Sequence, residues 1–329
     1  MPFVKEKFTV SEKIPAFLFI MRTFGFTQAQ AQRLVGKGRL LIAGVSIYNS
    51  GTKLEPGEVE IVYFKAASRG EKPLFANKDF MVFEKPSGVL VHPNTMSTPY
   101  SMLDEIRHIG GDNANAVHRI DMETSGLLLA SKHKQSEHYL KNAFEIKKIR
   151  KSYLAWADGE LTAPFSVALP VKTNHDYSEC KHKVFLHEDG KYAHTDFIPI
   201  HYDKTLDTTL VACYPLTGRT HQIRVHLFHV KHPILGDPLY GTTFETANAY
   251  LEDTLTQEER FVHTGAQRLM LHAQTLTFPY GAKYQIESKV NFGEMKALIC
   301  PQAERLFNTG NIQKQPPGAA QILPHEMDH

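Results

Sequence analysis

Residues 116–130 read Ala116-Val-His-Arg-Ile-Asp-Met-Glu-Thr-Ser-Gly-Leu-Leu-Leu-Ala130, and they are the most informative stretch of the chain. Polar and charged side chains crowd its first half, and an apolar run that ends at Ala130 forms the second half. An apolar strand that begins beside a charged loop can present reactive side chains from a rigid base. We expect Asp121 to be the carboxylate that carries chemistry.

The composition is that of an ordinary globular protein. The chain has 329 residues, which favours two domains, and 42% of the residues are hydrophobic and 22% charged. The formal net charge is only +2, so any nucleic-acid binding must come from local basic clusters. The cysteines are odd in number and far apart, and no stretch fits a signal peptide or a transmembrane helix. These features predict a cytoplasmic protein.

The N-terminal part, residues 1–65, predicts a small separate domain. Apolar side chains recur at helical spacing between Ile14 and Met21, and Gly25 ends that helix. Thr27-Gln-Ala-Gln30 fits a capping box at the start of a second helix, which ends at Gly36-Lys-Gly38. Strands are expected at 39–42, 45–48 and 59–64.

This order of two helices, a Gly-Arg segment and short strands resembles the S-four RNA-binding module. Residues 28–44 are the part that matches. The resemblance implies that a basic face of the domain contacts RNA phosphates. The alternative is a solvated helix surface with ordinary basic residues. The RNA-binding side chains would be those of Arg22, Arg33, Lys37 and Arg39.

The rest of the chain predicts a linker at 66–75, a second domain at 76–300 and a poorly ordered tail at 301–329. Two strands are expected on either side of a Lys85-Pro-Ser-Gly88 turn. The apolar pattern predicts further helices around 100–109, 134–146 and 223–230, strands at 152–157 and 269–278, and a mostly helical excursion at 242–268.

Basic residues gather at 147–151 and at Lys181-His-Lys183. Such loops at strand ends can line a positively charged cleft, although a charge run is more often a solvated face. A metal site is not predicted, because His226, His229 and His232 have no carboxylate or cysteine at ligand spacing.

No phosphate-cradling or dinucleotide-binding motif is present, which favours chemistry without a cofactor. A hydrolase that uses Ser125 and His118 is formally conceivable, but Ser125 is not in a G-x-S-x-G elbow. An aspartate hydrogen-bonded by an arginine is a competent nucleophile. From the residues alone, Asp121 could equally be half of an Asp–Arg salt bridge that joins two strands.

The segment His118-Arg-Ile-Asp-Met-Glu-Thr-Ser-Gly-Leu-Leu-Leu129 resembles the signature of the RluA family of RNA pseudouridine synthases. Four more segments match family motifs in the family's order, namely 84–93, 218–226, 232–241 and 268–273. The resemblance implies that a uridine in RNA is isomerised to pseudouridine without cofactor or metal. It also implies an α+β fold, with a bent, largely antiparallel mixed sheet preceded by the S-four-like domain.

The resemblance assigns roles to individual positions. Asp121 matches the catalytic aspartate, which attacks the uridine or assists the detachment of its base. Tyr153 matches the tyrosine that stacks on the target base and can move its proton, and Arg224 the arginine that pairs with the aspartate. Arg119 matches the residue associated with filling the gap left by the flipped base. Further substrate-binding positions are His118, Thr124, Gly218, Arg219, His221, Gln222 and Lys85.

The expected partner is RNA, with ribosomal RNA favoured over transfer RNA because of the S-four-like domain, and the protein is expected to act as a monomer away from membranes. One rival hypothesis is a non-catalytic RNA-binding or ribosome-assembly factor, which would have no need to keep Asp121, Tyr153 and Arg224 together. A second rival is an RNA glycosidase, which would release free uracil.

Overall fold

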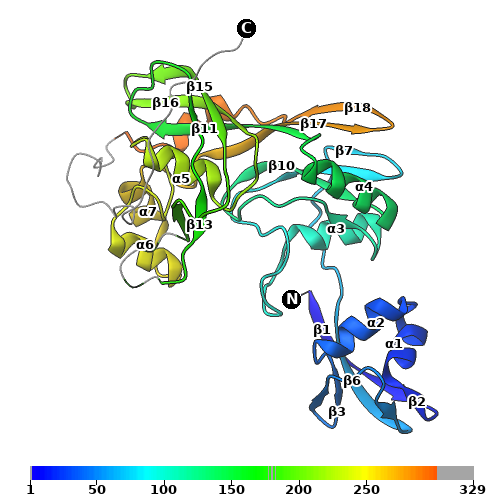
Figure 1. The fold of residues 1–329 in the computed structure, drawn as a ribbon. Coiled ribbons are helices and arrows are strands. Elements are labelled where there is room, and N and C mark those ends of the chain that lie inside the picture. Colours follow the sequence, from blue (N-terminus) through cyan, green and yellow to red (C-terminus); the bar gives the residue numbers. More distant parts are fainter. Residues whose placement is uncertain (1, 177, 179–180, 182, 302–329) are drawn as a thin grey trace. The chain divides into compact units, whose positions relative to one another are not determined.

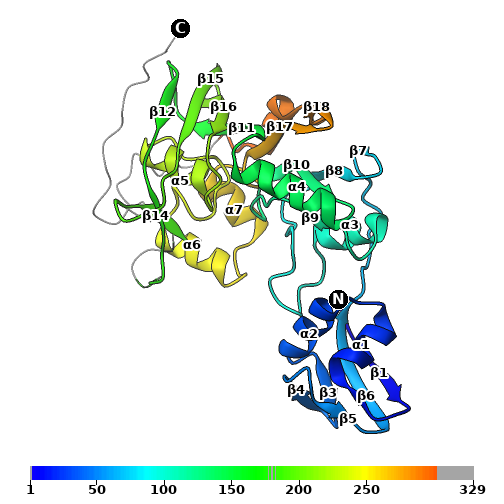
Figure 2. The same ribbon diagram turned by 45° about the vertical axis from the view of Figure 1, so that its right-hand side comes forward.

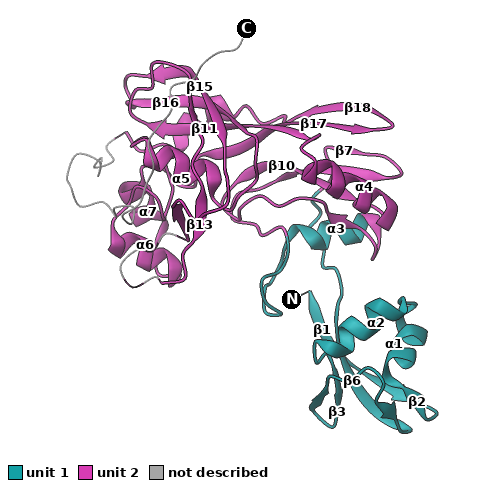
Figure 3. Cartoon of the chain, in the orientation of Figure 1, with its two compact units in different colours: residues 1–71, 92–109 teal, residues 72–91, 110–329 magenta. Residues whose placement is uncertain are grey.

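The computed structural model describes residues 2–176, 178, 181 and 183–301, and the chain forms two compact units. Figure 3 shows the first unit, residues 1–71 with 92–109, and the second, residues 72–91 with 110–329. The boundary at Glu71 lies inside the segment predicted to be a linker, whereas residues 92–109 were assigned by sequence to the second domain. Most of the predicted tail, residues 302–329, lies outside the described residues. Within the described part, no helix is both long and apolar enough to cross a membrane.

The first unit combines an antiparallel sheet with two short helices. The sheet has the order β1-β6-β3-β4, and a second pair joins β2 to β5. The first helix ends and the second begins as the sequence predicts, because Gly25 takes the left-handed conformation (φ 66°) after the first and Thr27 and Gln30 form the capping box of the second. Ile14, which was counted with the first helix, lies in β2 instead, and the helix starts after Pro15. The elements are β1 (Phe3–Val10), β2 (Ile14–Pro15), α1 (Ala16–Phe24), α2 (Gln28–Gly36), β3 (Leu40–Ile42), β4 (Val45–Ile47), β5 (Lys53–Leu54), β6 (Gly57–Phe64) and α3 (Met102–Gly110).

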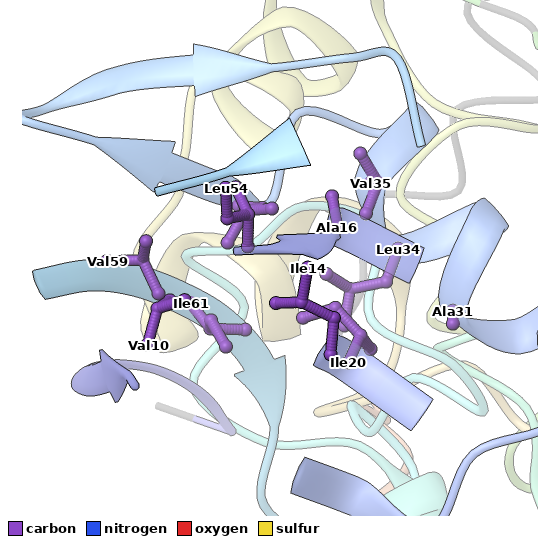
Figure 4. Close-up of a cluster of buried hydrophobic side chains, with 11 residues drawn as sticks. Val10, Ile14, Ala16, Ile20, Ala31, Leu34, Val35, Leu54, Val59 and Ile61 are labelled. Atoms are coloured by element: carbon purple, nitrogen blue, oxygen red, sulfur yellow. The ribbon is translucent and has the colours of Figure 1, made fainter. Parts of the chain in front are cut away.

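Apolar side chains from both helices and the sheet form the core of the first unit. Figure 4 shows the side chains of this cluster, which include Leu34 and Val35 of α2, Ile20 of α1 and the strand residues Val59 and Ile61. These side chains are at most 7% exposed. Their burial supplies the main stabilisation of the unit, because each fully buried aliphatic side chain contributes about 1.5–3 kcal/mol.

The segment predicted as a linker is held by hydrogen bonds within the first unit. The Ala67 N–H donates to Asp104 Oδ1 at 3.0 Å, and the Ser68 hydroxyl donates to Glu105 Oε2 at 2.6 Å. The Arg69 guanidinium lies over the Tyr100 ring, 4.1 Å from its centroid. The first part of this segment is therefore fixed to the residues around α3.

The second unit is built on one large mixed sheet. In the described residues the strand order is β12-β15-β16-β11-β17-β10-β8-β7, with β18 paired to β17 and β9 to β10. Among the described strand pairs of this sheet, only β10–β17 is parallel. This largely antiparallel sheet with flanking helices confirms the predicted α+β class. The strands are β7 (Phe75–Ala76), β8 (Phe80–Lys85), β9 (Asn115–Ala116), β10 (Ser125–Ser131), β11 (Arg150–Asp158), β12 (Phe165–Val167), β15 (Thr195–Asp203), β16 (Thr208–Pro215), β17 (Leu271–Tyr280) and β18 (Ala282–Glu287).

Helices cover parts of this sheet. Figures 1 and 2 both show α4 beside β10, and apolar residues of α4, including Leu140 and Ala143, pack on Leu127 and Leu129. α5 packs against β15 and β14. The predicted helix at 134–146 and the helical excursion at 242–268 are confirmed. The remaining elements are α4 (Lys134–Glu145), α5 (Gln222–His229), α6 (Phe244–Leu251), α7 (Gln257–Thr264), η1 (Phe292–Leu298) and the hairpin of β13 (Val171–Thr173) and β14 (Val184–Leu186).

One predicted strand is wrong. β8 precedes the turn at residues 85–88, but residues 89–92 form no strand after it. The Val89 carbonyl accepts a hydrogen bond from the Lys85 ammonium at 2.7 Å. The Lys85 side chain thus binds a backbone carbonyl that would otherwise accept a hydrogen bond from a neighbouring strand.

Candidate active site

The register of three strands brings distant parts of the sequence together. β17 lies between β10 and β11, and its residue Ala273 is paired with Gly126 on one side and with Tyr153 on the other. Gly126 has φ +107°, and a Cβ atom there would lie 2.4 Å from the Ala273 carbonyl oxygen. Only glycine fits this close approach. The loop that carries Asp121 is therefore anchored one strand away from Tyr153.

The strand that carries Tyr153 has an irregular register at this point. Ser152 is paired with Thr275 but Tyr153 with Ala273, so β17 has one extra residue, Gln274, opposite β11. Bulges of this kind commonly lie beside active sites, where they re-aim a side chain. Tyr153 is 8% exposed and lines a pocket.

This pocket contains most of the site residues predicted from sequence. Its walls come from the loop before β10, from β11, and from the turn between β16 and α5. The predicted residues that line it are Arg119, Asp121, Thr124, Tyr153, Gly218, Arg219, His221, Gln222 and Arg224. Ile120, Lys151, Pro215, Thr217, Ile223 and Leu271 complete the lining. We call it the Asp121 pocket.

Arg224 faces two carboxylates. Its Nη1 donates to Asp121 Oδ2 at 3.4 Å, although the two residues are 103 positions apart. Its Nε and Nη2 donate to Asp237 Oδ2 and Oδ1 at 2.7 and 2.8 Å. The sequence interpretation did not single out Asp237 as a partner of Arg224, although Asp237 belongs to the matching segment 232–241.

The buried pair of Arg224 and Asp237 is fully charged. Burial alone would lower the pKa of Arg224, but the adjacent Asp237 and Asp121 carboxylates raise it above its ordinary value. Burial pushes the pKa of Asp237 up, yet the guanidinium and the N–H groups of Leu239 and Tyr240 bring it below its usual range. The Asp121 side chain is 25% exposed, whereas that of Arg224 is 2% exposed. Asp121 is thus the member of this group that a ligand can reach.

Two aromatic side chains border Asp121. Burial and the Asp121 carboxylate raise the pKa of Tyr153, so its side chain is a neutral phenol at neutral pH. His221 begins α5 in the left-handed conformation (φ 52°), and its Nε2 lies 3.9 Å from Asp121 Oδ2. Burial, with help from Arg224, lowers the pKa of His221 to about 4, so its ring is neutral as well.

Gln222 shapes the turn at one wall of the pocket. Its Oε1 accepts from the Thr217 hydroxyl at 2.7 Å and from the Arg219 N–H at 3.0 Å. Its Nε2 donates to the His194 carbonyl at 2.9 Å. Because the side chain is 4% exposed and fully engaged, it fixes the backbone around Gly218 rather than offering a group to a ligand.

Lys85 and His118 do not line the pocket. The Lys85 ammonium is fully buried and donates to the carbonyls of Pro86, Val89 and Met122 at 2.8, 2.7 and 2.9 Å. Burial lowers the pKa of Lys85 to about 7, but three acceptors suit an ammonium with its three donors. Lys85 therefore ties the turn after β8 to the loop of Asp121.

His118 also has a structural partner. Its Nε2 accepts from the Leu129 N–H at 3.0 Å, and burial lowers its pKa to about 3. The Ser125 hydroxyl pairs with His272 Nδ1 at 2.8 Å. Ser125 and His118 therefore do not form the Ser–His pair that a hydrolase would need.

Glu123 is a second residue with a role that the sequence did not reveal. It is 6% exposed and lies two positions after Asp121. Its Oε2 accepts from Arg260 Nη2 at 2.7 Å, and its Oε1 accepts from the Tyr250 hydroxyl at 2.9 Å. Tyr250 is in α6 and Arg260 in α7, so the helical excursion holds the loop of Asp121.

The four basic residues predicted on the N-terminal domain differ in their surroundings. Arg33 and Lys37 are exposed, and within the described residues they form no ion pair. Arg22 Nη1 bonds Glu12 Oε1 at 2.7 Å, and Arg39 lies half-buried over the Phe3 ring at 4.5 Å. The described part of the chain holds no cluster of three or more His, Cys, Asp or Glu residues that could bind a metal ion.

Comparison with known proteins points to one family. The model of the RNA pseudouridylate synthase family matches residues 79–229. A protein of Helicobacter pylori named uncharacterized RNA pseudouridine synthase is 38% identical over 290 residues, which are 88% of this chain and 96% of that protein. The ribosomal large subunit pseudouridine synthase D of Xanthomonas campestris is 31% identical over 213 residues, covering 62% and 60% of the two chains.

Other similar proteins have different names. The tRNA pseudouridine synthase C of Pasteurella multocida is 33% identical over 220 residues, covering 63% of this chain and 85% of that protein. The solved structure of human RNA pseudouridylate synthase domain containing 1 shares the fold, with a TM-score of 0.54 and 23% identity over 69% of this chain and 86% of that one.

Proposed function

Because the chain belongs to the RNA pseudouridine synthase family, we propose that it isomerises specific uridines in structured RNA at the Asp121 pocket. In this reaction the bond from ribose C1′ to N1 of the base breaks and a bond from C1′ to C5 forms. The proton on C5 then leaves and N1 gains one, so the isomerisation needs no external oxidant or reductant. The observation that carries the proposal is the meeting of Asp121, Tyr153 and Arg224 in one pocket.

Asp121 is the group that starts the reaction. Its carboxylate is accessible from the pocket and receives one hydrogen bond from Arg224. It either attacks the uridine or assists the detachment of the base, and in both cases it must be ionised and aimed at the nucleotide. Arg224 supports both requirements as a buried cation that Asp237 holds in place.

Tyr153 provides the surface on which the target base stacks. The tyrosine lies on β11, so its position is set by a central strand rather than by a loop. Stacking on an aromatic side chain contributes about 1–3 kcal/mol for each base. Since the phenol is neutral, it can donate a hydrogen bond to a developing negative charge on the base.

The target uridine must leave its helix to reach Asp121. A paired, stacked base cannot present C5 and C1′ to a carboxylate, and flipping it costs a few kcal/mol. Arg119 is exposed at the pocket lining, so its long side chain is available to enter the gap in the RNA stack. Its guanidinium can stack on the neighbouring bases.

Ribosomal RNA is the favoured substrate. The support is the resemblance of residues 28–44 to the S-four module and the exposure of Arg33 and Lys37 on α2 and at its end. Similar proteins are named for ribosomal RNA and for transfer RNA alike, so both substrates belong in the test. The N-terminal domain would add phosphate contacts that the pocket cannot make.

Mapping of pseudouridine in cells tests the proposal. Ribosomal and transfer RNA are compared between cells that lack the protein and cells that express wild type, Asp121→Asn, or Lys134→Gln as a surface control. Wild type and Lys134→Gln should restore the same sites, and Asp121→Asn should restore none while still binding RNA. Restoration by Asp121→Asn would overturn the assignment of the carboxylate. Free uracil and abasic RNA would instead indicate a glycosidase.

A further inference from the structure

Lys151 lines the Asp121 pocket, whereas the sequence interpretation treated it only as part of the basic run 147–151 and gave it no role of its own. It lies on β11 two positions before Tyr153, and residues two apart on a strand point to the same face. Both side chains reach the pocket from that strand. The strand that supplies the stacking tyrosine thus also supplies a cation.

The Lys151 ammonium is a cation without a partner in the described residues, where it forms neither a hydrogen bond nor an ion pair. Lys151 is only partly buried, whereas the fully buried cations of this region have partners: Arg224 has two carboxylates and Lys85 has three carbonyls. Burial alone lowers the pKa of Lys151, to about 8, and no carboxylate offsets this effect. A partly desolvated ammonium that lines a pocket without a counterion is a position where an anionic ligand group can bind favourably.

The position of the ammonium places it at the mouth of the pocket. Lys151 Nζ lies 3.4 Å from the point where a Cβ atom on Gly218 would stand, so it lies against the turn between β16 and α5. Gly218 and Arg219 of that turn are exposed, and so is Arg119 on the opposite loop. The mouth therefore has positive charge on several sides, while Asp121, the carboxylate among the described lining residues, is bonded to Arg224.

We propose that Lys151 binds the phosphodiester that flanks the flipped uridine. A nucleotide that places its base against Tyr153 must leave its backbone at the mouth, where a phosphate can reach an ammonium beside Gly218. The inference rests on the proposed function, and it adds a specific anion-binding position to it. The ammonium is a compact point charge, which suits one phosphate oxygen better than a planar base edge.

Binding of unmodified transcripts of ribosomal and transfer RNA tests the role. The full-length wild type, Lys151→Met, Lys151→Arg and Lys148→Met are compared over a series of salt concentrations. Lys148 is the matched control, because it belongs to the same basic run, is exposed and does not line the pocket. The dissociation constant and the rate of pseudouridine formation at saturating protein are measured separately.

Lys151→Met should bind RNA about tenfold more weakly, which corresponds to the loss of one charge-assisted contact. Its plot of log binding constant against log salt should be shallower by about 0.7–0.9, the change for one phosphate contact. The rate at saturation should stay within about threefold of wild type. Lys151→Arg should keep most of the affinity, and Lys148→Met should change binding less than twofold.

An unchanged salt slope in Lys151→Met, or a lost rate with normal binding, would overturn the proposal. So would an equal loss in Lys148→Met, which would indicate general attraction by the basic run. Misfolding is excluded by thermal unfolding, in which Lys151→Met should be at least as stable as wild type because it removes an uncompensated charge. If wild type binds RNA but forms no pseudouridine, the proposed function fails while the salt slope still tests Lys151.

Discussion

Asp237 binds Arg224 through two hydrogen bonds, at 2.7 and 2.8 Å, and this leaves Nη1 as the guanidinium nitrogen that faces Asp121 at 3.4 Å. Asp237 is itself fixed, because it accepts the N–H groups of Leu239 and Tyr240 at 2.9 and 3.0 Å. The orientation of the arginine toward the Asp121 carboxylate is therefore set by a residue that does not line the pocket.

Replacement of Asp237 tests this positioning role. In Asp237→Asn the amide can accept only one of the two guanidinium hydrogen bonds, so Arg224 is expected to turn away from Asp121. The maximal rate of pseudouridine formation should fall at least about tenfold, with RNA binding within about twofold of wild type. Asp237→Ala should also destabilise the protein by about 3–5 kcal/mol in urea unfolding, because it leaves the buried Arg224 cation with only its 3.4 Å contact to Asp121. A full maximal rate in Asp237→Asn would contradict the role.

The buried ion pair between Glu123 and Arg260 is expected to couple α7 to the loop of Asp121. A double-mutant cycle of Glu123→Gln and Arg260→Met should show a coupling free energy of about 1–3 kcal/mol in denaturant unfolding, since both side chains are buried and bonded at 2.7 Å. The exposed pair Lys7–Glu58 is the control, and it should show no measurable coupling. Additive effects at Glu123 and Arg260 would show that the contact does not stabilise the loop.

Gly126 should not tolerate a side chain. In Gly126→Ala the Cβ atom would collide with the Ala273 carbonyl at 2.4 Å, and the residue would have to keep φ +107°. We expect a loss of at least about 3 kcal/mol of stability or no soluble protein. Gly281→Ala is the control, because Gly281 also has a positive φ (68°) but open space around it, and it should lose only about 1–2 kcal/mol. Equal losses of unfolding free energy in Gly126→Ala and Gly281→Ala would mean that the structure relieves the collision between the new Cβ atom and the Ala273 carbonyl.

RNA affinity should depend on pH through Lys151. Its pKa is lowered to about 8, so the ammonium is charged below pH 8 and neutral above it. Affinity is therefore expected to fall between about pH 7.5 and 9 in wild type, and to stay flatter in Lys151→Met. His118 and His221, with pKa values near 3 and 4, are neutral throughout this range. A fall of the same size in Lys151→Met would contradict the assignment of this pH dependence to Lys151.

The N-terminal domain is predicted to contribute binding rather than chemistry. The double variant Arg33→Gln/Lys37→Gln should weaken RNA binding about tenfold at moderate salt, with an unchanged rate at saturating protein. Arg22→Gln is the control, because Arg22 is already paired with Glu12 and should matter less. A loss of saturated rate, or no loss of binding, would argue against this division of roles.

Local features of the fold could be read from the sequence because they depend on neighbouring residues. Thr27 and Gln30 form their capping box, and Gly25 ends α1, since both effects involve backbone groups within one turn. The strand Phe3–Val10 was not predicted, although it alternates, because its stability comes from pairing with residues 57–64. The strand expected after Gly88 does not form for a related reason, since the Lys85 ammonium donates a hydrogen bond to the Val89 carbonyl.

The sequence by itself was enough to predict which residues form the site. Asp121, Tyr153 and Arg224 belong to motifs whose residue types and spacing are visible along the chain, and the structure brings them into one pocket. Only the tertiary structure decided what surrounds them: Asp237 behind Arg224, Glu123 between α6 and α7, and Lys151 without a counterion in the described residues. The burial and the ion pairs of these side chains depend on segments that are distant in sequence. Their charge interactions therefore form only when β17 pairs with both β10 and β11, as it does at Ala273.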